Sequence, residues 1–233
     1  MAVVLEGGCR VSTMHEGDPS MSGSLRVWNQ IGKATGATAI SLRILEFGPG
    51  ASLDLPNHEG DEVLYLERGS CTISIDGNAY EIGPETGIYL RPEQSFSVNN
   101  PGPAVVRFVS CQCPAESPSC SEASPIARLA DRRALPTADR WYRVLIDEQV
   151  TQFVGSIPPG RAPDHFHEYE EVLFILRGEG RMWAGETNTP IGPGSCVYLP
   201  RRQVHCVENT GNDELRLLGV FYPAGSPAVR YET

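Results

Sequence analysis

Long apolar segments are missing from this sequence of 233 residues, and so is an excess of positive charge. The apolar runs are short and stop well below the roughly 20 residues that a membrane-spanning helix needs. The 19 Lys and Arg side chains are outnumbered by 29 Asp and Glu, which gives a formal net charge of −10. Neutralising a nucleic-acid backbone requires clustered Lys and Arg. We therefore expect neither a membrane nor a nucleic acid as a partner.

We also expect no export signal. The first 24 residues contain no basic start followed by an apolar block, which is the pattern of a secretory signal peptide. The seven cysteines are an odd number, and in a chain without an export signal they are expected to be reduced thiols. Cys111, Cys113 and Cys120 lack a fourth ligand at zinc-finger spacing, so we interpret them as free thiols. These features predict a soluble cytoplasmic protein.

Helical periodicity is nearly absent, and only residues 126–135 are compatible with a short helix. The 24 glycines and 19 prolines are spread along the chain, and short runs of β-branched and aromatic residues lie between them. Many short strands with turn signals every eight to twelve residues are typical of an all-β sandwich or barrel. The segment 114–125 is rich in Ser, Pro and Glu without an apolar period, which indicates a linker.

The chain contains an internal repeat at an offset of 109 residues. Residues 58–109 align without a gap on residues 167–218, and 17 of these 52 positions are identical. The run 62–69 (EVLYLERG) matches 171–178 (EVLFILRG), and Ile-Gly-Pro recurs at 82–84 and 191–193. Two segments that are similar only in composition would not be expected to align Gly, Pro and Asn at matching positions without a gap. We therefore expect two similar strand-rich domains.

Three of the five histidines form one pattern in the second repeat. His165 and His167 are two residues apart, so on a strand their imidazoles face the same side. Glu171 follows on the neighbouring strand, and His205 begins a later strand. Three neutral imidazole nitrogens and one carboxylate oxygen suit a divalent transition metal such as Fe, Mn, Co, Ni, Cu or Zn.

These residues carry a family resemblance. The two motifs of the cupin superfamily resemble two stretches of this sequence, His165-x-His167-x3-Glu171-x6-Gly178 and Gly194-x5-Pro200-x4-His205-x3-Asn209. The resemblance extends over both repeats and implies a bicupin, with an N-terminal barrel at residues 1–113, a linker at 114–137 and a C-terminal barrel at 138–233. Each barrel would be a double-stranded β-helix, or jelly roll. It also implies that His165, His167, Glu171 and His205 hold one divalent transition metal ion per chain, and that the protein pairs into a homodimer.

The sequence departs from the family pattern in three places. Arg202 replaces the Gly usual before His205, which can re-aim the turn that presents this ligand, and the spacing from Gly160 to His165 is one residue short. In the first repeat, Pro56 and Phe96 stand where His165 and His205 stand in the second. His58 and Glu62 remain there, and we expect them to form a hydrogen-bonded pair. Because two ligands rarely hold a transition metal ion, the N-terminal barrel is predicted to be metal-free, with a structural or substrate-shaping role.

Four protein ligands leave positions open on an octahedral ion, which is typical of a catalytic site. The leading hypothesis is a metal-dependent, dioxygenase-like enzyme that acts on a small oxygen-rich organic molecule, with Glu171 as the catalytic base. One alternative is a metal-dependent isomerase or aminohydrolase similar to ureidoglycine aminohydrolase. Another is a small-molecule binding or storage protein without catalysis.

Other candidate residues have ordinary explanations. Cys206 is expected to face away from His205, because neighbouring strand residues alternate. The aromatic residues Phe153, Phe174, Trp183 and Tyr198 are expected in the core, with one or two of them lining the cavity. Arg161 and Arg181 are candidates for attracting an anionic substrate, although exposed arginines are usually solvated. The acidic runs 59–62 and 168–171 are interpreted as solvated turns, apart from Glu62 and Glu171.

Overall fold

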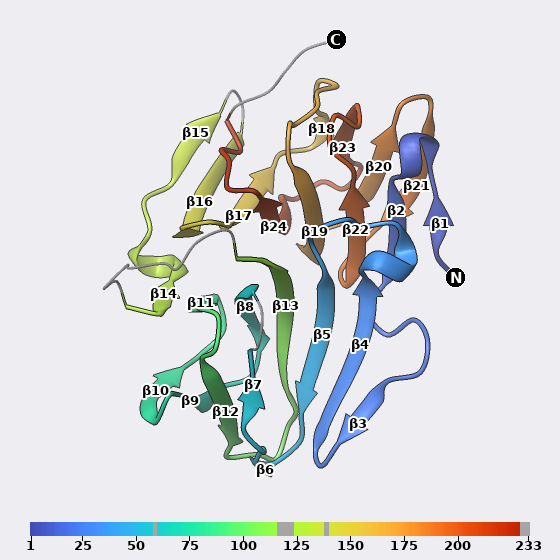
Figure 1. The fold of residues 1–233 in the computed structure, drawn as a ribbon. Coiled ribbons are helices and arrows are strands. Elements are labelled where there is room, and N and C mark those ends of the chain that lie inside the picture. Colours follow the sequence, from blue (N-terminus) through green and yellow to red (C-terminus); the bar gives the residue numbers. More distant parts are fainter. Residues whose placement is uncertain (58–59, 116–123, 138–139, 229–233) are drawn as a thin grey trace.

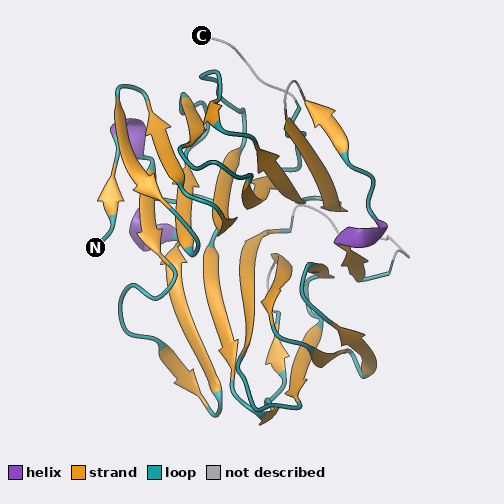
Figure 2. Ribbon diagram, turned by 180° about the vertical axis from the view of Figure 1, so that it is seen from behind, coloured by secondary structure: helices purple, strands orange, loops and turns teal. Residues whose placement is uncertain are grey.

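The computed structural model describes residues 1–57, 60–115, 124–137 and 140–228 (Figure 1). Strands in four sheets make up almost all of the regular structure there, and the helices are three short 3-10 turns (Figure 2). None of the described helices is long and apolar enough to cross a membrane. The predicted all-β class with two tandem barrels is confirmed. Residues 116–123 of the predicted linker lie outside the described residues.

The N-terminal barrel combines a larger sheet, in the order β14-β11-β8-β13-β5-β4-β3, with a smaller one, in the order β10-β9-β12-β6, to which β7 is added beside β12. The elements are β3 (Ser20–Ser22), β4 (Leu25–Ile31), η2 (Lys33–Thr35), β5 (Leu42–Phe47), β6 (Gly50–Ala51), β7 (Leu55–Pro56), β8 (Gly60–Arg68), β9 (Cys71–Ile75), β10 (Asn78–Ile82), β11 (Thr86–Leu90), β12 (Ser95–Asn100), β13 (Val106–Pro114) and β14 (Ile126–Arg128).

The C-terminal barrel has the same plan, with sheets ordered β1-β2-β22-β19-β24-β17-β16-β15 and β18-β23-β20-β21. The elements are β1 (Val3–Val4), η1 (Glu6–Gly8), β2 (Arg10–Thr13), η3 (Leu129–Asp131), β15 (Leu135–Thr137), β16 (Arg140–Asp147), β17 (Thr151–Ile157), β18 (Gly160–Arg161), β19 (Glu170–Arg177), β20 (Gly180–Ala184), β21 (Thr187–Ile191), β22 (Ser195–Leu199), β23 (His205–Asn209) and β24 (Leu215–Tyr222).

The two larger sheets pack against each other, so their central strands are buried on both faces. On β19, Leu173 and Ile175 belong to the core of the C-terminal barrel, whereas Val172 and Phe174 belong to a cluster shared by the two barrels. Strand β8 divides its side chains in the same way between barrel core and shared cluster. This double burial explains why these strands are nearly continuous apolar runs instead of alternating ones. It also fixes which residues face into each barrel.

Each barrel takes an edge strand from the segment that leads into the other barrel. Strand β2, near the N-terminus, pairs with β22 of the C-terminal barrel, and β14, which precedes the C-terminal barrel, pairs with β11 of the N-terminal barrel (Figure 1). The boundaries predicted at 113 and 138 divide the chain by position along the sequence. Three strand pairings cross them: β2 with β22, β14 with β11, and β15 with β16. The short helix expected over 126–135 is wrong: pairing with β11 holds the first three residues extended, and a single 3-10 turn follows.

A buried carboxylate on β19 ties the barrels together. Glu170 accepts hydrogen bonds from the backbone amides of Thr38, Ala39 and Ile40 at 2.9, 2.8 and 3.0 Å, from the Thr38 hydroxyl at 2.7 Å and from the Tyr198 hydroxyl at 2.6 Å. Burial alone would raise the pKa of Glu170, but these donors outweigh it and lower the pKa. The interpretation of this residue as part of a solvated turn is wrong, because it is buried and the N-terminal barrel supplies all of its donors except the Tyr198 hydroxyl.

Candidate metal centre

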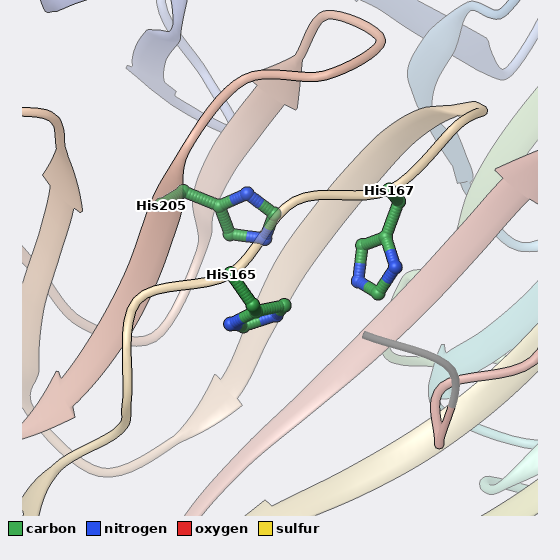
Figure 3. A group of neighbouring side chains, drawn as sticks. All are labelled: His165, His167 and His205. Carbon is green, nitrogen blue, oxygen red and sulfur yellow. The ribbon is translucent and has the colours of Figure 1, made fainter. Parts of the chain in front are cut away.

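The three histidines of the sequence motif converge at one end of the C-terminal barrel. His165 and His205 form an isolated antiparallel bridge, in which each backbone amide donates to the other's carbonyl, at 3.1 and 2.8 Å. His167 lies two residues further along the same segment, so its ring points to the same side (Figure 3). The ligand nitrogens of all three lie within 4.8 Å of one another. The sequence spacing therefore brings the three imidazoles into one group.

Backbone carbonyls fix the tautomers of two of these rings. Nδ1 of His165 lies 3.0 Å from the carbonyl of Pro163, and Nδ1 of His205 lies 2.7 Å from the carbonyl of Gln203. A carbonyl oxygen can only accept, so Nδ1 carries the hydrogen in each ring. In the neutral ring Nε2 is then the bare nitrogen that can ligate a metal ion.

Glu171 completes the group from β19. Its side chain faces the barrel interior, and Oε2 lies 3.4 Å from Nε2 of His205 and 3.9 Å from Nε2 of His167. This oxygen is buried and accepts no hydrogen bond from the described residues. A buried carboxylate oxygen without a donor is costly, and a cation would satisfy it. Three imidazole nitrogens and one carboxylate oxygen therefore fit a divalent transition metal ion, because such ions accept both kinds of donor.

The ionisation states agree with a cation site. Burial, together with the nearby rings of His205 and His167, lowers the pKa of His165 to about 3, so this ring is neutral at ordinary pH. Burial raises the pKa of Glu171, whereas donation from His205 and the positive charge of the neighbouring imidazoles in their protonated form lower it by more, so this carboxyl is ionised. Neutral imidazoles and an ionised carboxylate are the forms that bind metal.

The group opens into a cavity of about 90 Å³ inside the barrel. Its walls are mainly apolar and include Phe153, Phe221 and Leu173, and Arg140 adds a positive charge. Phe153 and Phe221 lie 4.9 Å apart between ring centroids. Of the four aromatic residues considered from the sequence, only Phe153 lines this cavity. Arg140 was missed, because it precedes the repeated segment and no motif marks it.

Arg202 takes the backbone conformation of the glycine that it replaces. Its φ is 61°, in the left-handed region that glycine favours. Its backbone amide donates to the carbonyl of His167 at 2.7 Å, and its guanidinium pairs with the exposed Glu168 at 2.8 Å. The turn before His205 is therefore kept and joined to the strand segment that carries the other two histidines.

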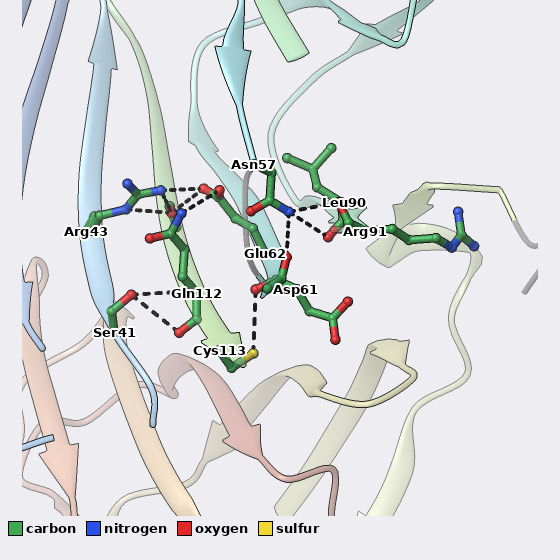
Figure 4. A network of polar contacts seen from close by, with 11 residues as sticks. Ser41, Arg43, Asn57, Asp61, Glu62, Leu90, Arg91, Gln112 and Cys113 are labelled. Atoms are coloured by element: carbon green, nitrogen blue, oxygen red, sulfur yellow. Dashed lines mark hydrogen bonds and ion pairs between the residues drawn. The ribbon is translucent and has the colours of Figure 1, made fainter. Parts of the chain in front are cut away.

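The corresponding place in the N-terminal barrel contains an internal cation. Arg43 donates to Glu62 at 2.7 Å, Ser110 donates to the same oxygen at 2.6 Å, and Gln112 donates to the other oxygen at 3.1 Å (Figure 4). Arg43 lies opposite Ser110 across the sheet, as Phe153 lies opposite Gly219 in the second barrel. The Arg43 guanidinium therefore lies beside Glu62 at the position where, in the C-terminal barrel, the Phe153 ring lines the cavity at the histidines.

The pair expected between His58 and Glu62 is not tested, because His58 lies outside the described residues. Glu62 nevertheless has a full set of donors from Arg43, Ser110 and Gln112. Phe96, which replaces the last histidine, is buried in the core of its barrel. The absence of a metal ion from the N-terminal barrel stays a prediction. Arg43 supports it by supplying a positive charge to Glu62, and the sequence analysis missed this residue.

Replacing Arg43 by Met tests this assignment. We expect unchanged metal content and a loss of about 2 kcal/mol of unfolding free energy, because Glu62 loses its counter-charge; the loss falls below the range for fully buried pairs since Arg43 is 23% exposed. Adding Glu62→Gln should recover part of the loss. Elemental analysis and urea denaturation measure both quantities. Loss of metal from Arg43→Met would instead place an ion in the N-terminal barrel.

The remaining candidates from the sequence lie outside the centre. Cys206 faces away from His205 and accepts a contact from Nε of Arg161 at 3.3 Å. The guanidinium of Arg161 lies 4.1 Å above the ring of Trp183, and Arg181 donates to Asn188, so neither arginine lines the cavity. Cys111 and Cys113 are free buried thiols, whereas Cys120 lies outside the described residues.

Comparison with known proteins identifies the family. The family model described as a cupin domain matches residues 43–111 and 153–221, which together make up more than half of the chain. The chain is 33% identical to auxin-binding protein 1 of Arabidopsis thaliana over 84 residues, 32% of this chain and 42% of that protein. It is 38% identical to an oxalate-binding protein of Thermotoga maritima over 68 residues, 28% of this chain and 56% of that protein. The chain thus spans about half the length of these relatives.

Solved structures show the same two-barrel fold. A variant of the oxalate decarboxylase of Bacillus subtilis has a TM-score of 0.75 at 13% identity, with 92% of this chain and 77% of that chain covered. The putative glyoxylate-induced protein of Pseudomonas aeruginosa has a TM-score of 0.80 at 16% identity, with 97% and 93% covered. The chain belongs to the cupin family and carries one cupin domain in each of its two barrels.

Proposed function

We propose that the C-terminal barrel binds one divalent transition metal ion through His165, His167, Glu171 and His205. We further propose that the protein is a dioxygenase-like enzyme for a small oxygen-rich organic molecule. The observation that carries the proposal is the buried Oε2 of Glu171, which accepts no hydrogen bond within the described part of the chain and lies beside the group of three imidazoles. A bound ion would supply Lewis acidity to substrate oxygens that chelate it.

The residues around the ion define what the substrate must be. A cavity of about 90 Å³ admits only a small molecule or one end of a larger one. The side chains of Phe153 and Phe221 exclude water and suit a planar, weakly polar body. An enol, catechol or hydroxy acid has the required adjacent oxygens. The oxalate-binding and oxalate decarboxylase relatives support a substrate rich in oxygen.

Glu171 is proposed as the base. Its pKa is lowered, so it is ionised and able to accept a proton from a substrate hydroxyl. Its position on β19 is rigid because the strand is paired on both sides, with β22 and β24. Because its pKa is lowered, this carboxylate would hold the proton only transiently and pass it on to the product.

Oxygen uptake tests the reaction class. The metal-loaded protein is mixed with a panel of catechols, enols and hydroxy acids in an oxygen electrode, with His205→Ala as the control. We expect uptake with at least one compound and only background uptake with the control. Turnover without oxygen would favour the isomerase or aminohydrolase alternative, and saturable binding without turnover would favour a binding or storage protein.

A further inference from the structure

A second cavity, of about 470 Å³, lies where the two barrels meet. It is bordered by the N-terminal segment around β2, by the turn that follows η2, and by the end of β22. Arg10, Arg201, Glu170 and Tyr198 contribute its polar side chains, and Gly36 leaves part of its wall open. It shares no lining residue with the cavity at the histidines. The junction cavity is therefore a separate place on the molecule.

The positive charge of this junction cavity has no partner among the described residues. Neither Arg10 nor Arg201 forms an ion pair with a described carboxylate, and Nε of Arg10 is buried without a hydrogen-bond acceptor. A buried guanidinium donor that lacks an acceptor is unfavourable. The two arginines line one cavity, so their positive charges can act together on a single ligand.

Glu170, the one acidic residue in the lining, is not available to the arginines. Both of its oxygens already accept from the Thr38, Ala39 and Ile40 amides and from two hydroxyls, as described above. These donors hold the carboxylate towards the N-terminal barrel. Its charge lowers the net positive charge of the cavity without supplying acceptors to Arg10 or Arg201.

The equivalent cavity on the other side of the junction contains acidic as well as basic side chains. There Tyr89 donates to Asp61 at 2.8 Å, as Tyr198 donates to Glu170. That cavity, of about 400 Å³, contains two arginines but also Asp147 and Glu148. The internal repeat thus provides a comparison: two acidic side chains line one cavity beside its two arginines, whereas Glu170, whose oxygens already accept from other donors, is the acidic side chain described in the lining of the other.

We propose that the junction cavity is a second ligand site, which binds a small molecule carrying a doubly charged oxyanion, either a phosphate or a dicarboxylate. Guanidinium groups bind both kinds of oxyanion through paired, charge-assisted hydrogen bonds. Nε of Arg10 would gain the acceptor that it lacks, and Arg201 would close the exposed side. The site is independent of the metal centre and does not rest on the proposed reaction.

Isothermal titration with inorganic phosphate and with succinate tests the proposal and separates the two sources of oxyanion. We expect saturable binding of one of them at one site per chain, weakened about tenfold or more by Arg10→Gln and by Arg201→Gln. Arg26→Gln is the matched control, because it removes the same charge from an exposed position on β4. His205→Ala is the second control, because it removes a proposed metal ligand; both controls should bind the anion as the unaltered protein does.

Three results would overturn the proposal. The first is the absence of saturable binding of either anion. The second is an equal loss in Arg26→Gln, which would mean that the overall charge of the surface attracts the anion. The third is loss in His205→Ala with retention in Arg10→Gln and Arg201→Gln, which would assign the anion to the metal centre. Arg201 is exposed, so Arg201→Gln is expected to fold and keeps the test decisive if Arg10→Gln does not.

Discussion

Purified protein with His205 replaced by alanine is expected to contain almost no transition metal, whereas the unaltered protein contains about one equivalent per chain. His205 supplies one of four donors, and its strand also holds His165 through the reciprocal backbone bridge. Loss of an outer partner of a metal ligand already weakens binding by roughly 10–100-fold, so loss of a ligand itself should weaken it by at least about 100-fold. Elemental analysis after gel filtration measures the content.

Cys206→Ala is the matched control for this experiment. The residue is the next one on β23, is equally buried and faces the opposite side, where it contacts Arg161. We expect full metal content in this variant and unchanged strand structure by circular dichroism in both. If His205→Ala keeps its metal while Cys206→Ala loses it, the ion is bound on the other face of the strand and the proposed ligand set is wrong.

Replacing Glu170 by alanine is expected to lower the free energy of unfolding by about 3–5 kcal/mol. The change leaves three backbone amides and two hydroxyls at the barrel junction without their shared acceptor. For a chain of this size, this corresponds to a fall of roughly 10 °C in Tm. Differential scanning calorimetry measures it, and it also shows whether the two barrels then unfold separately.

Glu168→Ala is the control for that prediction. Glu168 lies two residues away and pairs with the exposed Arg202, so its loss should cost less than about 1 kcal/mol. The donors lower the pKa of Glu170 below the ordinary 4.5. Its stabilisation is therefore present above that pH and is lost as the pH falls, so the difference between the unaltered protein and Glu170→Ala should shrink in acid. Equal effects of the two substitutions would mean that Glu170 does not hold the barrels together.

The sequence predicted those features of the fold that depend on local pattern. Short apolar runs between Gly and Pro indicate strands, and the ungapped repeat indicates two domains, because both signals are contained in contiguous residues. The pairing of β2 with β22 joins residues almost two hundred positions apart, and nothing in the run Arg10–Thr13 specifies that partner. Edge strands that are exchanged between domains are set by tertiary packing and not by local sequence.

The grouping of the three histidines could be predicted from the sequence, and the residues around them less so. The spacing of His165 and His167 and the strand alternation at Glu171 place these side chains on one face. Arg43 and Arg140 were missed because each precedes a repeated segment and no motif marks either of them. Glu170 was misinterpreted because an acidic run beside a turn is usually solvated, and only the fold shows that a loop of the other barrel covers it.

X-ray absorption at the edge of the bound metal tests the central claim most directly. The claim predicts one ion per chain whose inner shell contains three imidazole nitrogens and one carboxylate oxygen at about 2.0–2.2 Å, with the remaining positions filled by light exchangeable ligands. A shell that contains sulfur, or one with fewer than two imidazoles, would contradict it, because the buried cysteines or the surface would then be the binding site.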